Sequence, residues 1–220
     1  MRAAFFDLDE TILDRSGSLQ NFVEWQAKGM LRSCIVDTSK FVERFIELDQ
    51  NGMVWKDKVY ESLIEEFKIT GWTAEELLNT YLLTFCSFCK PRNGALAAIE
   101  SFRSRGYKIG LVSNGKTPFQ ERNFRALGFN ELFACVIVSE AVGVRKPDKA
   151  IFELACRTVN ADLATSYFIG DNPKADMEGA KNAGMKTIYV PADSGVDRCE
   201  YADVTFADLS ELPDYVMREG

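Results

Sequence analysis

The chain has 220 residues, of which 46% are hydrophobic and 6 are proline, so it can form one large domain or a core with a smaller insertion. Its net charge of −7, from 33 acidic and 26 basic residues, argues against a broad nucleic-acid-binding surface. The chain has no histidine, which excludes a Ser-His-Asp triad and histidine-ligated zinc. Acid–base chemistry therefore falls to carboxylates, lysine, tyrosine or cysteine.

No apolar run approaches the length of a membrane span, and the first residues read as a buried strand rather than as a leader. We therefore predict a cytoplasmic protein with no membrane partner. Its 6 cysteines are predicted to be reduced and packed among apolar neighbours. The Cys86-Ser87-Phe88-Cys89 motif lacks the second pair that a zinc site requires. Nothing in the sequence indicates the oligomeric state.

The first predicted element is an apolar strand at residues 2–7, which ends in Asp7 and is followed by Asp9. A strand of this kind is buried on both faces, so Asp7 should lie at the carboxyl edge of a sheet, where open α/β folds bind their ligands. Two carboxylates about 4 Å apart repel by ~4 kcal/mol at an effective dielectric of 20. The pair therefore needs a cation, a shared proton or a solvated turn, and a polar turn is the alternative without function.

Residues 15–88 show helical periodicity with little strand signal, which predicts a helical insertion after the first strand. The predicted helices span residues 19–28, 39–49, 55–67 and 74–85. The segment is rich in aromatic side chains, which either form its core or stack on a base or ring of a ligand. They are Trp25, Trp55, Trp72, Phe85 and Phe88.

The remainder of the chain alternates between strands and helices. Strands are predicted at 107–112, 133–138, 166–171 and 186–190, with a short sixth strand at 203–206. Helices are predicted at 93–105, 118–127, 148–159 and 174–183. This alternation predicts a Rossmann-like parallel sheet with helices on both faces. The expected organisation is a core of residues 1–14 and 89–220, with residues 15–88 as the inserted domain.

Two further strands end in polar groups. Ser113, Asn114 and Gly115 follow the 107–112 strand, where backbone amides and the serine hydroxyl can hold a phosphate. Lys146 follows the 133–138 strand, and Pro147 is expected in the first turn of the next helix, which would let Lys146 reach over the sheet edge. Taken singly, an ordinary turn and a solvated lysine are the alternative interpretations.

The fourth strand also ends in an acid, Asp171, and a second acid, Asp176, lies in the first turn of the following helix. Together with Asp7 and Asp9, these acids would crowd one sheet edge. Such a group of hard oxygen ligands, without sulfur or imidazole, is suited to Mg²⁺. The sequence therefore predicts a magnesium site at this edge.

Residues 110–117 also match the G-x-x-x-x-G-K-[ST] pattern of a P-loop. A P-loop needs its loop between the two glycines, after the strand has ended. Here Gly110, Leu111 and Val112 are predicted to be the strand itself, which leaves too few residues to wrap a phosphate chain. We therefore do not expect a nucleotide-hydrolysing P-loop.

The strand-end motifs together resemble those of the haloacid dehalogenase-like superfamily of hydrolases. The motifs occur in the family's order and cover residues 1–14 and about 89–200, and the helical insertion resembles the family's type-1 cap. They are Asp7-Leu8-Asp9-Glu10-Thr11, Ser113-Asn114, Lys146, and Gly170-Asp171 through Asp176.

The resemblance implies an aspartyl-phosphate mechanism. Asp7 would attack phosphorus, and Asp9 would protonate the leaving oxygen and then deprotonate the attacking water. Mg²⁺ would be bound by the Asp7 carboxylate, the Asp9 backbone carbonyl and the Asp171 carboxylate, while Asp176 would orient these ligands or water.

The phosphoryl oxygens would be held by Ser113, by the Asn114 amide and by Lys146, which would also neutralise Asp7. The dehalogenase branch of the family lacks a second acid such as Asp9, so the pair favours phosphoryl transfer. The resemblance thus implies a Mg²⁺-dependent phosphatase acting on a small phosphate ester. Among candidate substrates, a nucleotide or sugar monophosphate is preferred over a small phosphorylated acid such as phosphoglycolate.

Two alternatives share the same fold. A phosphomutase would use the same motifs, which do not distinguish it from a hydrolase. A non-catalytic module that binds a phosphate ligand would need none of the catalytic residue types, although all of them are present.

Overall fold

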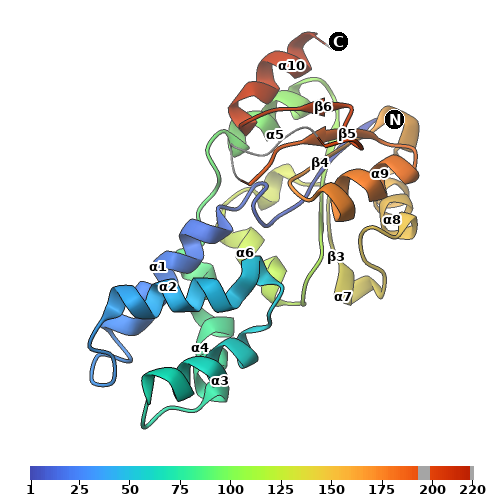
Figure 1. Cartoon of the computed structure of the whole chain (residues 1–220). Coiled ribbons are helices and arrows are strands. Elements are labelled where there is room, and N and C mark those ends of the chain that lie inside the picture. The colour runs from blue at the N-terminus through green and yellow to red at the C-terminus, as the bar shows by residue number, and fades with distance from the viewer. Residues whose placement is uncertain (193–198, 219–220) are drawn as a thin grey trace. The chain divides into compact units, whose positions relative to one another are not determined.

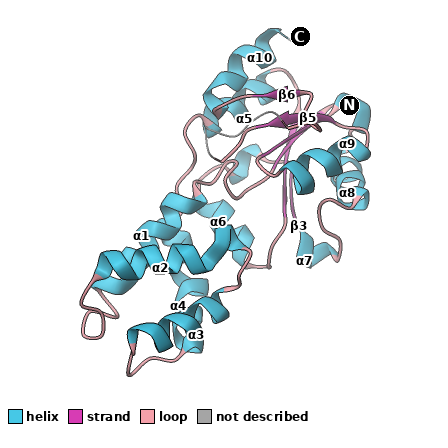
Figure 2. Cartoon of the chain, in the orientation of Figure 1, coloured by secondary structure: helices cyan, strands magenta, loops and turns pink. Residues whose placement is uncertain are grey.

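The computed structural model describes residues 1–192 and 199–218 (Figure 1). Contacts within the chain divide it into two compact units. The first unit comprises Met1–Asp14 and Pro91–Gly220, and the second comprises Arg15–Lys90. The second unit contains only helices and connecting segments, whereas every strand of the described chain lies in the first unit (Figure 2).

The first unit is built on a six-stranded sheet in the order β3-β2-β1-β4-β5-β6. Every pair of neighbouring strands in it is parallel, which confirms the predicted Rossmann-like sheet. The strands are β1 (Ala3–Phe6), β2 (Lys108–Ser113), β3 (Cys135–Val138), β4 (Tyr167–Gly170), β5 (Lys186–Tyr189) and β6 (Val204–Thr205). Because β1 is central, the residues that follow it lie in the middle of the carboxyl edge, where strand order reverses.

Successive residues of β1 show why the strand is apolar throughout. Phe5 belongs to the core cluster that includes Phe152 of α8 (Lys149–Val159), whereas Phe6 packs edge-on against Phe102 of α5 (Ala95–Ser104), with ring centroids 6.0 Å apart. Phe5 and Phe6 point to opposite faces, and both are fully buried. Helices therefore cover both faces of the sheet. Helix α10 (Leu212–Arg218) packs on α5, and α9 (Gly179–Asn182) packs on α8.

Several boundaries differ from the sequence predictions. Helix α6 spans Phe119–Ala126, close to expectation, but α7 (Ser139–Val142) and α10 were not predicted. The predicted helix at 174–183 is a π-helical turn, Pro173–Glu178, followed by α9. Short 3₁₀ turns, also not predicted, occur at Asn130–Leu132, Leu163–Thr165 and Leu209–Glu211.

The placement of Pro147 in a first helical turn is wrong. Helix α8 begins at Lys149 and is capped by Asp148, whose carboxylate accepts a hydrogen bond from the backbone N–H of Ala150 at 2.9 Å. An aspartate at the N-cap stabilises the helix more directly than a proline in the first turn, so the helix starts after it. Pro147 therefore lies in the connecting loop, next to Lys146.

The second unit consists of four helices and two 3₁₀ turns. They are α1 (Arg15–Lys28), α2 (Thr38–Asp49), α3 (Lys56–Phe67), α4 (Ala74–Thr84), and the turns Gln50–Gly52 and Phe85–Phe88. Phe22 is fully buried and contacts Phe85 and Phe88, with ring centroids 6.1 and 5.5 Å away. Phe85 is therefore core and Phe88 is half-buried against Phe22, whereas Trp25 keeps 41% of its surface exposed.

A buried ion cluster holds three helical segments of the second unit together. The Asp49 carboxylate lies 2.8 Å from the Arg15 guanidinium and also pairs with the Lys56 ammonium. Its Oδ2 atom accepts a further hydrogen bond from the Gly52 backbone N–H at 2.9 Å. Removing one partner of such a cluster leaves a buried charge unpaired, so the cluster fixes how α1, α2 and α3 pack.

The structure also answers the remaining sequence questions. Gly110, Leu111 and Val112 lie within β2 and are buried, so the stretch is a strand and not a P-loop. All six cysteines are free thiols, and Cys86 and Cys89 lie in or beside the 3₁₀ turn Phe85–Phe88. Within residues 1–192 and 199–218, none of the helices combines the length and the apolar character of a membrane span.

Candidate active site

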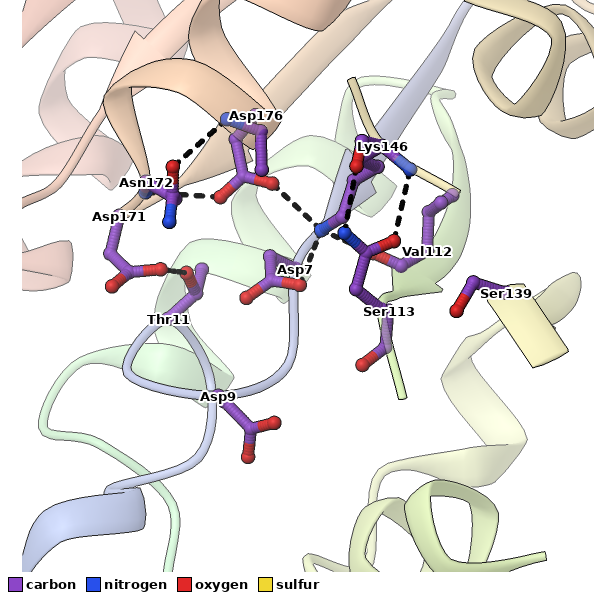
Figure 3. A network of polar contacts seen from close by, with 12 residues as sticks. Asp7, Asp9, Thr11, Val112, Ser113, Ser139, Lys146, Asp171, Asn172 and Asp176 are labelled. Atoms are coloured by element: carbon purple, nitrogen blue, oxygen red, sulfur yellow. Dashed lines mark hydrogen bonds and ion pairs between the residues drawn. The ribbon is translucent and has the colours of Figure 1, made fainter. Parts of the chain in front are cut away.

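The polar strand ends meet at one place on the carboxyl edge of the sheet (Figure 3). Asp7 directly follows β1, Ser113 is the last residue of β2, and Asp171 directly follows β4. Since β1 pairs with both β2 and β4, these three residues are brought side by side by the sheet itself. Lys146 reaches the same edge from the loop before α8.

Lys146 is the centre of this group. Its ammonium lies 2.5 Å from Asp7 Oδ1, 2.7 Å from Asp176 Oδ1 and 2.9 Å from the carbonyl oxygen of Val112. The contacts with Asp7 and Val112 are hydrogen bonds, and the contact with Asp176 is an ion pair. The Phe168 ring lies beneath the ammonium, with its centroid 5.2 Å away. Lys146 is only 3% exposed. Lys146 is therefore a buried counter-charge and not a solvated surface lysine.

Asp176 and Asp171 complete the acidic side of the group. Asp176 is 1% exposed, and its Oδ2 atom accepts a hydrogen bond from the Asn172 backbone N–H at 3.1 Å. The absence of a side chain at Gly170 makes this possible, because a Cβ there would lie 2.4 Å from Asp176 Oδ2. Asp171 faces Thr11, whose hydroxyl lies 3.4 Å from Asp171 Oδ1.

The electrostatics of the group favour the binding of a cation. Asp7, Asp171 and Asp176 each place a carboxylate oxygen within 4.8 Å of the others, and one lysine faces them. Burial raises the pKa of Asp7 to about 7, against the pull of Lys146, and Asp176 and Asp9 raise it further. Burial also raises the pKa of Asp171, again with help from Asp7 and Asp176. A divalent cation would relieve this repulsion, and these hard oxygens suit Mg²⁺, so the residues present fit the metal.

Asp9 does not join this group through its carboxylate. Its side chain points away from Asp7 and Lys146, as the Ser113 hydroxyl also does (Figure 3). Between them lies a residue that the sequence analysis did not identify. The side-chain amide of Gln120 donates to Asp9 Oδ2 at 2.6 Å and to Ser113 Oγ at 2.9 Å.

The side chain of Asn114 binds the backbone of Lys146. Its amide nitrogen donates to the Lys146 carbonyl oxygen, and its amide oxygen accepts from the Lys146 backbone N–H, both at 2.9 Å. This pair of bonds fastens the Lys146 loop to the end of β2. Of the two amides of Asn114, the backbone N–H is therefore the one left to bind a phosphoryl oxygen.

This arrangement places a carboxylate beside a cation, a second carboxylate nearby and a buried hydroxyl at one edge. Asp7 is held at one oxygen by Lys146, which leaves Oδ2 for a second role. The site can therefore bring a nucleophile, an acid–base group and hydrogen-bond donors to a single tetrahedral anion. Gln120, which contacts two members of this set, was not identified from the sequence.

Comparisons with known proteins agree on one family. A family model described as haloacid dehalogenase-like hydrolase matches residues 4–190. Glyceraldehyde 3-phosphate phosphatase of Pyrococcus furiosus is 26% identical over 232 residues, which cover 100% of this chain and 95% of that protein. Pyrimidine 5'-nucleotidase YjjG of Escherichia coli is 27% identical over 86% of this chain and 85% of that protein.

The fold is also found among solved structures. The putative hydrolase YfnB of Bacillus subtilis, whose structure is described as bound to magnesium, superposes with a TM-score of 0.77 over 98% of each chain. At 23% identity, this likeness concerns the fold alone.

Proposed function

The chain belongs to the haloacid dehalogenase-like hydrolase family, and we propose that it is a Mg²⁺-dependent phosphatase that hydrolyses small phosphomonoesters through a phosphorylated Asp7. The observation that carries this proposal is the buried Asp7–Lys146 pair, at 2.5 Å, within a group of three carboxylates. The two relatives described above have names that state small phosphate esters as substrates, a triose phosphate and a pyrimidine nucleotide.

In the first step, a carboxylate oxygen of Asp7 attacks phosphorus and the bond to the leaving oxygen breaks. Asp9 gives that oxygen a proton, and the alcohol departs. In the second step, Asp9 takes a proton from water, the water oxygen attacks phosphorus, and the Asp7–phosphorus bond breaks. Inorganic phosphate is released and Asp7 is regenerated.

The donors around Asp7 hold the transferred group. The Ser113 hydroxyl and the Asn114 backbone N–H are available to phosphoryl oxygens. Lys146 donates hydrogen bonds to Asp7 and to the Val112 carbonyl oxygen, and it forms an ion pair with Asp176. When Asp7 becomes an acyl phosphate, its oxygen is a weaker acceptor, so we expect the Lys146 donor to turn to a phosphoryl oxygen.

Asp7, Asp171 and the backbone carbonyl of Asp9 would hold Mg²⁺, and Asp176 would keep Lys146 and Asn172 in place around it. The metal would supply charge neutralisation to the attacking carboxylate and to the phosphoryl group. We assign the first unit as the catalytic core and the helical second unit, residues 15–90, as the cap that selects the leaving group. Its boundary lies two residues after the predicted 88. A sugar or nucleotide monophosphate remains the preferred substrate class.

The direct test is phosphate release from a panel of phosphomonoesters that includes triose phosphates, nucleoside monophosphates, phosphoserine and phosphoglycolate. Each ester is assayed with Mg²⁺ and with excess EDTA. We expect release with Mg²⁺ only, and the ranking of kcat/KM identifies the substrate class. The absence of release from every ester would contradict hydrolysis and leave a mutase or a binding role.

Ser113→Ala should weaken the reaction without abolishing it. The hydroxyl is one of several donors to the phosphoryl group, so we expect kcat/KM to fall by about 10- to 100-fold, less than the 10²- to 10³-fold typical for loss of an oxyanion-hole donor. Ser139→Ala is the matched control, because Ser139 also lies at this edge but its hydroxyl contacts the backbone of Gly115. Wild-type kinetics in Ser113→Ala would remove Ser113 from the site.

The response of stability to Mg²⁺ should depend on pH. Burial raises the pKa of Asp7 from 3.8 to about 7, so the metal-free folded protein binds a proton at Asp7 more tightly than the unfolded chain does. The free energy of unfolding of the metal-free protein therefore falls as pH rises towards and through about 7. Mg²⁺ binds the ionised form and restores that loss. We therefore expect the Mg²⁺-induced rise in Tm to be larger at about pH 8 than at about pH 6. An equal rise at both pH values, or an unchanged rise in Asp171→Asn, would contradict the assigned ligands.

A further inference from the structure

Gln120 lies on α6 and bridges two residues of the proposed site, Ser113 and the sequence-distant Asp9. We propose that it is a positioning residue, which holds the Asp9 carboxylate for proton transfer and sets the direction of the Ser113 hydroxyl. This inference rests on the proposed function, because it assigns Gln120 a part in that reaction.

The first support is geometric. One amide nitrogen, Gln120 Nε2, lies 2.6 Å from Asp9 Oδ2 and 2.9 Å from Ser113 Oγ. Its two hydrogens are therefore both used, one on each site residue. The residue is only 3% exposed, so its contacts are shielded from water.

The surroundings of Gln120 fix its side chain. Asn123, one turn later on α6, donates from its side-chain amide towards Gln120 Oε1 at 3.4 Å, which matches an orientation with the nitrogen facing Asp9. On the other side, Gly115 gives it room, because a Cβ there would lie 2.6 Å from Gln120 Cγ. A long polar side chain is thus held in one conformation by two neighbours.

The consequence for Ser113 follows from its hydrogen-bonding capacity. A hydroxyl has one donor hydrogen and accepts through its oxygen. Because Gln120 donates to that oxygen, the hydroxyl hydrogen is directed elsewhere, and a phosphoryl oxygen is the acceptor that the proposed reaction supplies. Gln120 therefore converts Ser113 into a donor.

Gln120 also holds the Asp9 carboxylate in a fixed position. Asp9 follows the strand in a loop, and its side chain points away from Lys146 (Figure 3). Gln120 is the residue that gives this carboxylate a fixed partner, on the same side as the Ser113 hydroxyl. Proton transfer to a leaving oxygen requires such a fixed placement.

The test compares two esters that differ in their need for a proton. An alkyl phosphate such as glycerol phosphate needs general acid help, whereas p-nitrophenyl phosphate has a stable leaving group and needs little. Gln120→Met keeps the shape of the side chain and removes the donors. We expect kcat/KM, which reports the first phosphoryl transfer and not the later water step, to fall about 10-fold further for the alkyl ester than for the aryl ester, as for loss of a hydrogen bond to a charged group.

A second readout reports on Ser113. Inorganic phosphate, used as a competitive inhibitor, should bind about threefold to tenfold more weakly to Gln120→Met than to the wild type. Gln120→Leu is a second donor-free variant if Gln120→Met folds poorly, and Arg125→Ala, an exposed position on the same helix, is the control.

Asp9→Asn separates this inference from the proposed function. In the Asp9→Asn background, Gln120→Met should lower kcat/KM by the same factor for both esters, because only the loss of the Ser113 contact then remains. The decisive outcome is a wild type that is active and an Asp9→Asn variant that loses more kcat/KM with the alkyl ester than with the aryl ester. If Gln120→Met then lowers kcat/KM equally for both esters, the positioning role is wrong and the proposed function stands. If the wild type hydrolyses neither ester with Mg²⁺, the proposed function fails and this role fails with it.

Discussion

Replacing Asp7 with asparagine should lower kcat by ~10³-fold or more, a loss of ~4 kcal/mol in transition-state stabilisation. An amide of the same size keeps the fold but is too weak a nucleophile to displace an alkoxide. Because burial and two neighbouring acids raise the pKa of Asp7, the neutral amide also relieves repulsion. We therefore expect Asp7→Asn to be inactive and at least as stable as the metal-free wild type. The measurement is steady-state phosphate release, with thermal unfolding in EDTA as the second readout.

The matched control for Asp7→Asn is Asp148→Asn, an exposed acid at the same edge whose carboxylate caps α8. Asparagine also caps helices well, so Asp148→Asn should change the Tm only slightly and leave kcat near the wild-type value. Wild-type turnover in Asp7→Asn would show that another residue attacks phosphorus.

Replacing Lys146 with methionine should cost both activity and stability. Methionine fills the space of the alkyl chain but leaves Asp7 and Asp176 without their cation. Breaking a buried ion pair by removing one partner typically costs about 3–5 kcal/mol, and loss of an oxyanion donor costs about 10²- to 10³-fold in kcat. We expect a lower Tm in EDTA, which Mg²⁺ partly restores. Thermal unfolding and phosphate release measure the two effects.

Lys149→Met is the control for Lys146→Met, since Lys149 is exposed and lies three residues later. It should change neither Tm nor kcat appreciably. If Lys146→Met were as stable as Lys149→Met in the absence of metal, the ammonium would not be neutralising the buried acids.

The sheet could be predicted because its strands are buried on both faces. Phe5 and Phe6 pack on opposite helical layers, so β1 reads as a continuous apolar run. Helix α10 was missed because, of its 7 residues, only Leu212 and Val216 are buried. Two apolar residues four positions apart do not establish a helical period.

The site also contains residues that the sequence identifies and one that it does not. Asp7, Asp171 and Lys146 could be found because each follows a strand that the sequence reveals. Gln120 could not, because its role depends on how α6 packs beside the loop that carries Asp9, 111 positions away. The available signal was a weak one, a polar residue four positions before buried Phe124 on the inner face of α6. Helical spacing places the two on one face but does not say which groups meet them.

The central claim is that the phosphoryl group passes through Asp7, and trapping that intermediate tests it most directly. The protein is mixed with its best ester and Mg²⁺, quenched in acid within one turnover and reduced with borohydride, which converts an acyl phosphate to the alcohol. We predict homoserine at position 7 by peptide mass spectrometry, and none in Asp7→Asn. Reduction at another carboxylate, or substrate turnover with no trapped residue, would contradict the mechanism.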